Sequence, residues 1–124
     1  MKMFVSDKDG KVNFVDENNV FLGYEISTSC CENPGFFITS TPQAEVPDPL
    51  PKDPQELTEY RFDTHYFCKV SGGIFHDGGM VIFKAVSIVD DKPIYIHLFN
   101  IQNGYYSHGF QFSENGKDIQ QDSI

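Results

Sequence analysis

Two histidines in the last third of the chain, His97 and His108, are the residues whose type and spacing could most directly support chemistry. They flank Asn103-Gly104, a pair that favours a two-residue β-turn. A type I′ turn there predicts a hairpin in which Ile101 lies opposite Tyr106 and the two histidines are diagonal neighbours on one face. Such a pair could bind a metal ion with a third ligand from a neighbouring strand. It could equally pack between aromatic rings with no ion.

The cysteines do not form a recognisable catalytic or metal-binding arrangement. Cys30, Cys31 and Cys68 have no C-x2-C spacing, and adjacent cysteines do not easily form a disulfide with each other. Glu32 follows Cys31 directly, and a neighbouring carboxylate disfavours the reactive thiolate. We therefore predict no catalytic residue, metal site or cofactor. The alternative is a metal- or thiol-dependent enzyme that uses His97, His108 and Cys31.

The charge of the chain excludes several classes of partner. Eighteen acidic and nine basic residues give a formal net charge of −9, and the lysines and arginines do not cluster anywhere along the chain. Nucleic acids and anionic membranes are bound through basic patches, so we predict neither as a partner. An acidic surface can attract a basic protein and speed its association, or it can serve solubility alone.

The size and composition indicate one folded domain. The chain has 124 residues, 40% of them hydrophobic and 15% aromatic, which is too apolar for a disordered protein. It contains no apolar run of the ~20 residues that a membrane-spanning helix needs. The first residues lack the apolar stretch of a secretory signal, so we expect a cytoplasmic protein with reduced cysteines.

Most of the chain reads as β-strands separated by turn-forming residues. Residues 60–70 alternate between two faces, which predicts one buried and one solvent-facing side. Residues 80–89 and 93–99 are apolar on both faces, as in central strands covered on both sides. We predict a mostly β (β-rich α+β) fold, as a single antiparallel sheet or a small sandwich or barrel. The predicted strands cover residues 11–15, 20–27, 35–41, 60–70, 80–89 and 93–99.

Two segments differ in composition from the rest. Residues 42–54 contain five of the seven prolines and predict an extended surface loop. Asp53-Pro54 followed by Glu56 is a helix-start pattern, so we expect one short helix near residues 54–60. Residues 113–124 are polar and predict a frayed tail. The expected organisation is a single domain over residues 1–112 with a C-terminal tail over 113–124.

Exposed tyrosines make the predicted hairpin tip a candidate protein-binding surface. Tyr105 and Tyr106 follow the predicted turn, and tyrosine suits rigid, half-solvated contacts. In the alternative interpretation Tyr106 packs on Ile101 and only stabilises the hairpin. The sequence thus supports a non-catalytic module that binds a basic protein, and it also leaves open a structural or oligomer-forming module.

Two stretches resemble a group of small bacterial and phage domains of unknown function. They are "GYEISTSCCENPGFFI" (23–38), with a Cys-Cys-Glu turn, and "IYIHLFNIQNGYYSHGFQF" (94–112), with an NGYYS turn. The resemblance implies an α+β or mostly-β fold and a bacterial or phage origin, and no known activity. The resemblance raises the question whether the two turns meet in space. In one interpretation Glu32, Ser107, Tyr105 and a histidine line a polar pocket, and in the other Glu32 only accepts hydrogen bonds from turn amides. The binding residues we predict are Tyr105, Tyr106, Asn103, Ser107, His108, Cys31 and Glu32.

Overall fold

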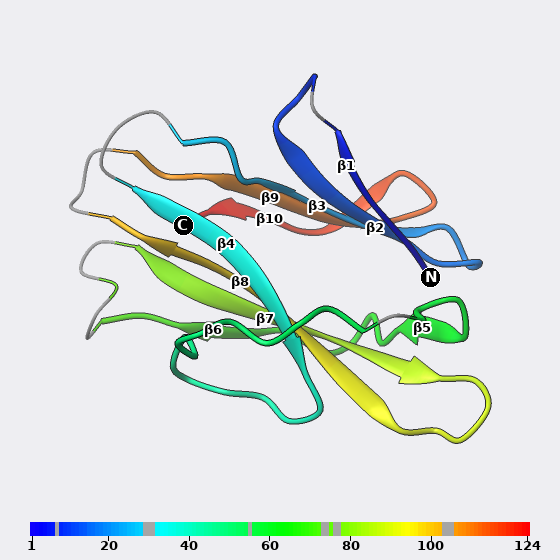
Figure 1. Cartoon of the computed structure of the whole chain (residues 1–124). Coiled ribbons are helices and arrows are strands. Elements are labelled where there is room, and N and C mark those ends of the chain that lie inside the picture. Colours follow the sequence, from blue (N-terminus) through cyan, green and yellow to red (C-terminus); the bar gives the residue numbers. More distant parts are fainter. Residues whose placement is uncertain (7, 29–31, 55, 73–74, 76–77, 103–105) are drawn as a thin grey trace.

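The protein folds as two antiparallel β-sheets of five strands each (Figure 1). The computed structural model describes residues 1–6, 8–28, 32–54, 56–72, 75, 78–102 and 106–124. The first sheet has the order β1-β2-β3-β9-β10, and the second has the order β4-β8-β7-β5, with β6 also paired to β7. The strands are β1 (Lys2–Ser6), β2 (Lys11–Val15), β3 (Val20–Glu25), β4 (Asn33–Thr39), β5 (Tyr60–Phe62), β6 (Cys68–Val70), β7 (Gly79–Ser87), β8 (Pro93–Ile101), β9 (Gly109–Glu114) and β10 (Lys117–Ser123). The mostly β prediction is confirmed.

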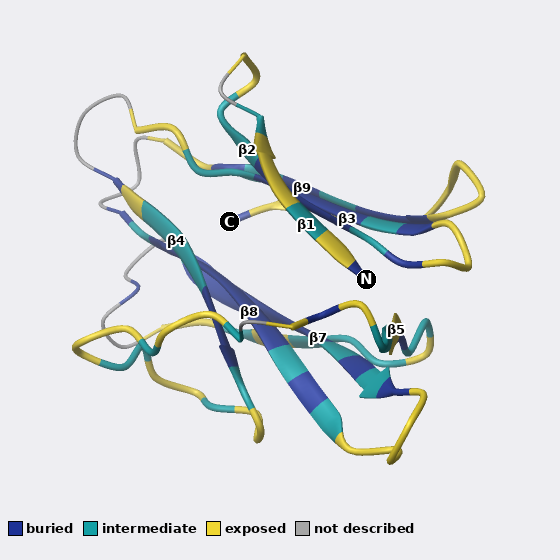
Figure 2. Cartoon of the chain, turned by 45° about the vertical axis from the view of Figure 1, so that its right-hand side comes forward, coloured by how far each residue is buried: buried dark blue, intermediate teal, exposed yellow. Residues whose placement is uncertain are grey.

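The two sheets pack face to face around one main core. Alternate residues of each strand point between the sheets, where the ring of Phe83 lies 4.8 Å from that of Phe112 and 5.9 Å from that of Phe110. Figure 2 shows that the buried residues lie along the strands of both sheets. Other buried members of this core are Val12, Phe14, Val20, Leu22, Tyr24, Ile38, Val81, Ala85, Ile96 and Leu98.

The outer face of the second sheet carries a smaller core. Phe37, Met80, Ile82 and Phe99 are buried there, and Val46 from the proline-rich loop packs on them. The loop over residues 42–54 has no regular structure and covers this face, as its composition predicts. Strands β7 and β8 are therefore apolar on both faces because one face meets the first sheet and the other meets this loop.

The predicted hairpin around Asn103-Gly104 is wrong. β8 belongs to the second sheet and β9 to the first, so the strands that flank the pair do not hydrogen-bond to each other. β8 already pairs with β4 on one edge and β7 on the other, which leaves it no free edge for β9. His97 consequently lies opposite Phe37 and Ile82. Residues 103–105 lie outside the described part of the chain.

The predicted polar tail is instead an edge strand. β10 pairs with β9, and Ile124 behind it is only 5% exposed. The backbone amide of His108 donates to the Ile124 carbonyl, and the amide of Ile124 donates back. Backbone hydrogen bonds hold such a strand without an apolar pattern in its side chains. The domain therefore extends through residues 113–124.

The segment 53–70 also differs from its prediction. Glu56 accepts hydrogen bonds from the backbone and hydroxyl of Thr58, which stabilise a turn, and residues 53–54 and 56–60 contain no helix. The predicted strand 60–70 is divided into β5 and β6 by a turn in which Asp63 accepts from the backbone amide of His65. β1, which we did not predict, is an edge strand at the start of the first sheet. Within the described residues, no helix has the length and apolar character needed to cross a membrane.

Candidate functional site

Glu32 and His108, from the stretches 23–38 and 94–112, are in contact at one end of the sandwich. Nε2 of His108 lies 3.2 Å from Oε1 of Glu32, and Nδ1 lies 2.8 Å from the backbone oxygen of Glu25. Nδ1 is placed to donate to that carbonyl, and Nε2 faces the Glu32 carboxyl group. Both side chains are almost fully buried, at 6% and 1% exposure. Two of the predicted binding residues are therefore in contact, and their role in binding stays a prediction.

Asn100 anchors the chain just before His108. Its side-chain amide donates to the backbone oxygens of Tyr106, at 3.2 Å, and Ile124, at 2.8 Å. Tyr106 is 47% exposed and Ser107 is exposed, so both lie on the surface above the buried pair. Among the described residues, Oδ1 of Asn100 is buried without a hydrogen-bond donor. The other predicted binding residues, Cys31, Asn103 and Tyr105, lie outside the described residues.

His97 is part of the outer core of the second sheet rather than of this end. Its ring stacks on Phe37 with centroids 4.2 Å apart. Nε2 accepts from the backbone amide of Gln43 at 3.0 Å, and Nδ1 donates to the Tyr95 carbonyl at 3.1 Å. Burial lowers the pKa of His97 below its usual value. His97 lies on β8 of the second sheet and His108 just before β9 of the first, so the predicted placement of the two histidines as diagonal neighbours in one hairpin is wrong.

The described part of the chain also contains no set of residues that could bind a metal ion. Within it, no three histidine, cysteine or carboxylate side chains lie close enough together to hold an ion. Both ring nitrogens of each of the two histidines already face a protein hydrogen-bond partner. Coordination would require breaking one of these bonds.

The turn between β7 and β8 presents two adjacent exposed apolar side chains, one of which, Val89, is the most exposed large hydrophobic residue described. Ile88 is 48% exposed and Val89 is 73% exposed. The sequence analysis missed this feature because it treated 80–89 as one continuous strand. The Asp90-Asp91-Lys92-Pro93 stretch that follows is turn-forming and was the available signal. We call residues 88–91 the β7–β8 tip.

Hydrogen bonds fix the shape of the β7–β8 tip. Oγ of Ser87 accepts from the backbone amide of Val89 at 3.1 Å, and the amide of Asp91 donates to the Ser87 carbonyl at 3.0 Å. Oδ1 of Asp90 accepts from the backbone amide of Lys92, which holds the pKa of Asp90 below its usual value. The two apolar side chains are therefore displayed on an ordered turn.

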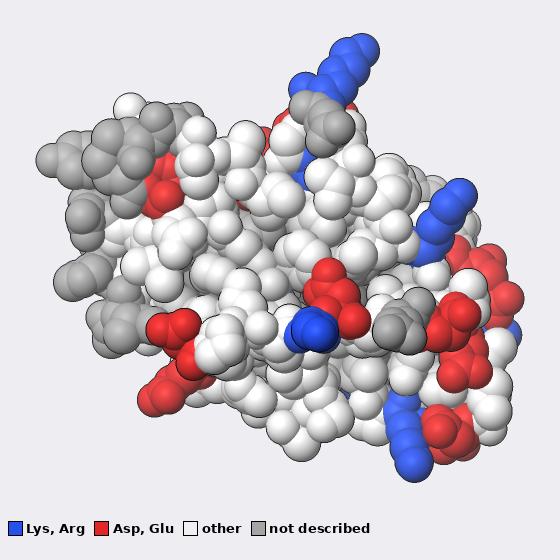
Figure 3. All heavy atoms as spheres, viewed as in Figure 1, with Lys and Arg blue, Asp and Glu red and all other residues white. Residues whose placement is uncertain are grey.

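Acidic side chains surround the β7–β8 tip. Figure 3 shows them gathered at the right-hand end of the molecule, where Figure 1 places this turn and the turns that precede β3 and β10. Arg61 nearby is already paired with Glu17. The backbone of Glu59 accepts a hydrogen bond from Ile88, which ties the tip to the segment before β5. Asp63 and Asp91 line the same surface depression as Ile88, and Glu17 reaches this end through its pair with Arg61.

Comparison of the chain with models of known protein families, with curated proteins and with solved structures found no match. The resemblance to small bacterial and phage domains stays a prediction.

Proposed function

We propose that this protein is a non-catalytic module that binds a basic protein through the β7–β8 tip. The observation that carries the proposal is the exposure of Ile88 and Val89 on a hydrogen-bonded turn within an acidic surface. Exposed apolar side chains of this kind mark interaction surfaces when they form a patch with a polar rim. Such a module would act as an immunity or inhibitor protein in the cytoplasm of a bacterium or in a phage-infected cell.

The geometry of the turn favours binding energetically. Binding normally costs conformational entropy when loops become ordered, and the bonds to Ser87 reduce that cost in advance. Val89 and Ile88 would supply the apolar centre of the contact, and Asp90 and Asp91 its charged rim. The net charge of −9 would speed the encounter with a basic partner.

The tyrosines near the other turn are a less suitable surface for the same partner. The β7–β8 tip precedes β8 and Tyr106 follows it, so the nine residues of that strand separate them. A strand of this length spans about 30 Å, and one small partner would not contact both ends. Self-association through the tip is also disfavoured, because it would bring two acidic surfaces together.

The proposal is tested by capturing a partner and then mapping its contact. Tagged wild-type protein is incubated at low salt with a bacterial lysate, and the captured protein is identified, purified and titrated by calorimetry. We expect saturable binding by a basic protein, weakened at higher salt because exposed charges are screened. The substitution Val89→Ser should reduce affinity at least ~10-fold, which corresponds to about 1.4 kcal/mol.

Leu50→Ser is the matched control, since Leu50 is an exposed apolar residue of the proline-rich loop with 45% exposure. It should bind like the wild type. Equal affinities of all three proteins for the purified partner would contradict the assignment of the tip. Capture of nothing above the background of the tag would contradict the proposed function itself.

A further inference from the structure

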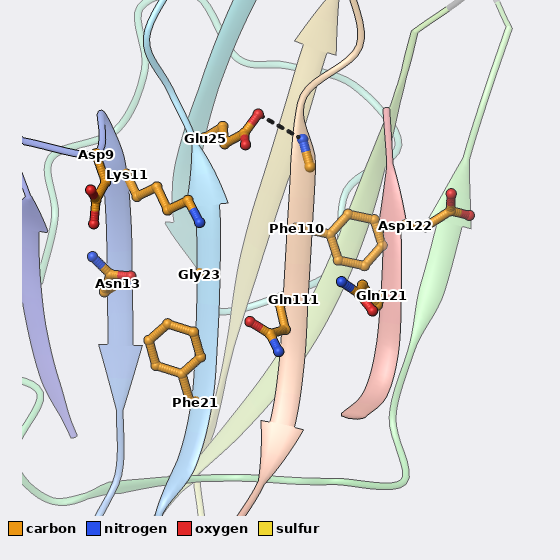
Figure 4. A pocket seen from close by; sticks show the side chains of 11 residues that line it. Asp9, Lys11, Asn13, Phe21, Gly23, Glu25, Phe110, Gln111, Gln121 and Asp122 are labelled. Carbon is orange, nitrogen blue, oxygen red and sulfur yellow. Dashed lines mark hydrogen bonds between the residues drawn. The ribbon is translucent and has the colours of Figure 1, made fainter. Parts of the chain in front are cut away.

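The outer face of the first sheet contains a hollow of about 280 Å³ that lies apart from the β7–β8 tip. Its floor is a row of directly opposed residues on four strands: Asn13 on β2, Gly23 on β3, Gln111 on β9 and Gln121 on β10. Figure 4 shows these side chains and the ring of Phe21 around the hollow. We call it the amide hollow.

Gly23 makes the depression in the middle of the row. A Cβ added at Gly23 would lie 2.8 Å from Cζ of Phe21 and 3.2 Å from Oδ1 of Asn13. Only glycine therefore allows the aromatic ring to lie over the strand next to the asparagine amide. The ring is partly exposed, so it offers an apolar surface to a molecule in the hollow.

Asn13 is a buried amide that points to a ligand. It is only 6% exposed, lines the hollow, and its side chain makes no hydrogen bond to any described residue. Its amide atoms are not among the fully buried polar atoms that lack a partner, so they face the solvent of the hollow. A molecule in the hollow could supply the missing donor and acceptor. Asn13 can therefore bind a molecule in the hollow without first breaking a hydrogen bond to another described residue.

Two further groups of the hollow are already held in place. Nε2 of Gln111 donates to Oδ1 of Asp118 at 2.7 Å, which fixes the orientation of that side chain. Oε2 of Glu25 accepts from the backbone amide of Gly109 at 3.2 Å, as the dashed line in Figure 4 shows. A site whose polar groups are oriented before binding loses less entropy when it is occupied.

The charges of the amide hollow exclude an anionic ligand. Asp9, Glu25 and Asp122 line it, and Lys11 is the basic residue among its lining side chains. Figure 4 shows Lys11 extending from β2 toward β3, on the same side as Glu25. An anion would meet an excess of carboxylates and be repelled.

We propose that the amide hollow binds one unit of a neutral saccharide. Amide side chains both donate and accept hydrogen bonds, and sugar hydroxyls do the same, so Asn13, Gln111 and Gln121 match them chemically. The partly exposed face of Phe21 fits the apolar face of a sugar ring. The volume is near the lower limit of ligand pockets and suits a single ring.

Titration of the isotopically labelled full-length protein, followed by its backbone amide NMR signals, tests this site. The probes are cellotriose, maltotriose and triacetylchitotriose, each up to about 10 mM, which is tenfold above a dissociation constant of ~1 mM. We expect at least one sugar to produce saturable shifts at Asn13, Gly23 and Gln111. Glucuronate, which is anionic, should produce none.

The variants Gln121→Ala and Asn13→Ala should each weaken binding of the responding sugar at least ~5-fold while thermal unfolding stays cooperative. Asn18→Ala is the matched control, because it removes an exposed amide from the turn after β2. Failure of all three sugars to shift these signals would overturn the proposal. Equal affinities of the Asn13→Ala, Gln121→Ala and Asn18→Ala variants for the sugar would also overturn it, since the sugar would then bind elsewhere.

Discussion

The two histidines that first suggested chemistry have opposite environments. His97 lies in an apolar layer, stacked on Phe37, and burial favours its neutral form. His108 lies among oxygen atoms, with its two ring nitrogens facing the Glu25 carbonyl and the Glu32 carboxyl group. Histidine therefore packs against an aromatic ring at position 97 and makes polar contacts with two oxygen atoms at position 108. Neither role could be read from spacing along the chain.

The buried ring of His97 predicts a specific pH dependence of stability. Because its pKa in the folded state is below the ordinary 6.5, the unfolded chain binds the proton more readily. Stability should therefore decrease as the pH falls below 6.5 and continue to decrease until the folded-state pKa is passed. Urea unfolding at about pH 7.5 and about pH 5.5 measures this loss.

The variant His97→Phe should lose less stability than the wild type over the same interval, because its ring stays on Phe37 but cannot take up a proton. His65→Ala is the control, since His65 is exposed and should retain the wild-type dependence. An unchanged pH dependence in His97→Phe would show that other groups cause the loss.

At the scale of elements, β10 shows the limit of reading strands from hydrophobic alternation. Its side chains are mostly polar and exposed, because an edge strand is held by backbone hydrogen bonds on one side. Its far end is anchored by Ile124, which is buried in the main core. Asn100 and His108 both bond to the backbone there. The strand thus joins the first sheet to the polar end of the sandwich.

The substitution Ile124→Ala separates an anchored strand from a frayed tail. Removing a buried isoleucine side chain typically costs 2–5 kcal/mol, so we expect a loss of about 2 kcal/mol or more in the free energy of unfolding. Ser123→Ala is the matched control at the exposed neighbouring position and should change it by less than about 0.5 kcal/mol. Chemical denaturation measures both. Equal effects of the two variants would support a frayed segment.

At the scale of the whole molecule, aromatic rings join the two sheets into one cooperative unit. Phe83 on the second sheet contacts Phe110 and Phe112 on the first, and Phe67 packs against the same group. Neither sheet could bury its inner face alone. The loss of one central ring should therefore weaken both sheets together.

We expect Phe83→Ala to lower the free energy of unfolding by about 3–5 kcal/mol, because it leaves a cavity where the sheets meet. Unfolding should be followed both by far-ultraviolet circular dichroism and by tyrosine fluorescence, and the two transitions should coincide. Phe4→Ala is the control, since Phe4 on β1 is 45% exposed, and its effect should stay below about 1 kcal/mol. Separate transitions in the wild type would argue against a single unit.

Local patterns were sufficient to predict the class of fold and most strands. β2 matches its predicted range, and β3, β4, β7 and β8 match theirs within a few residues, because turn residues and apolar alternation act over short distances. The proline-rich loop was also predictable, since proline restricts its own backbone. The pairing of β8 with β4 and β7 was not, because it depends on which edges are already occupied.

The sequence by itself therefore determined the mostly β architecture, the covered faces of β7 and β8, and the acidic charge. Only the tertiary structure decided that β8 and β9 lie in different sheets, that Glu32 meets His108, and that Ile88 and Val89 are exposed. It alone also revealed the row of three amides and one glycine across four strands. The physical reason is that pairing and burial join residues far apart in the chain, where no local pattern specifies the partner.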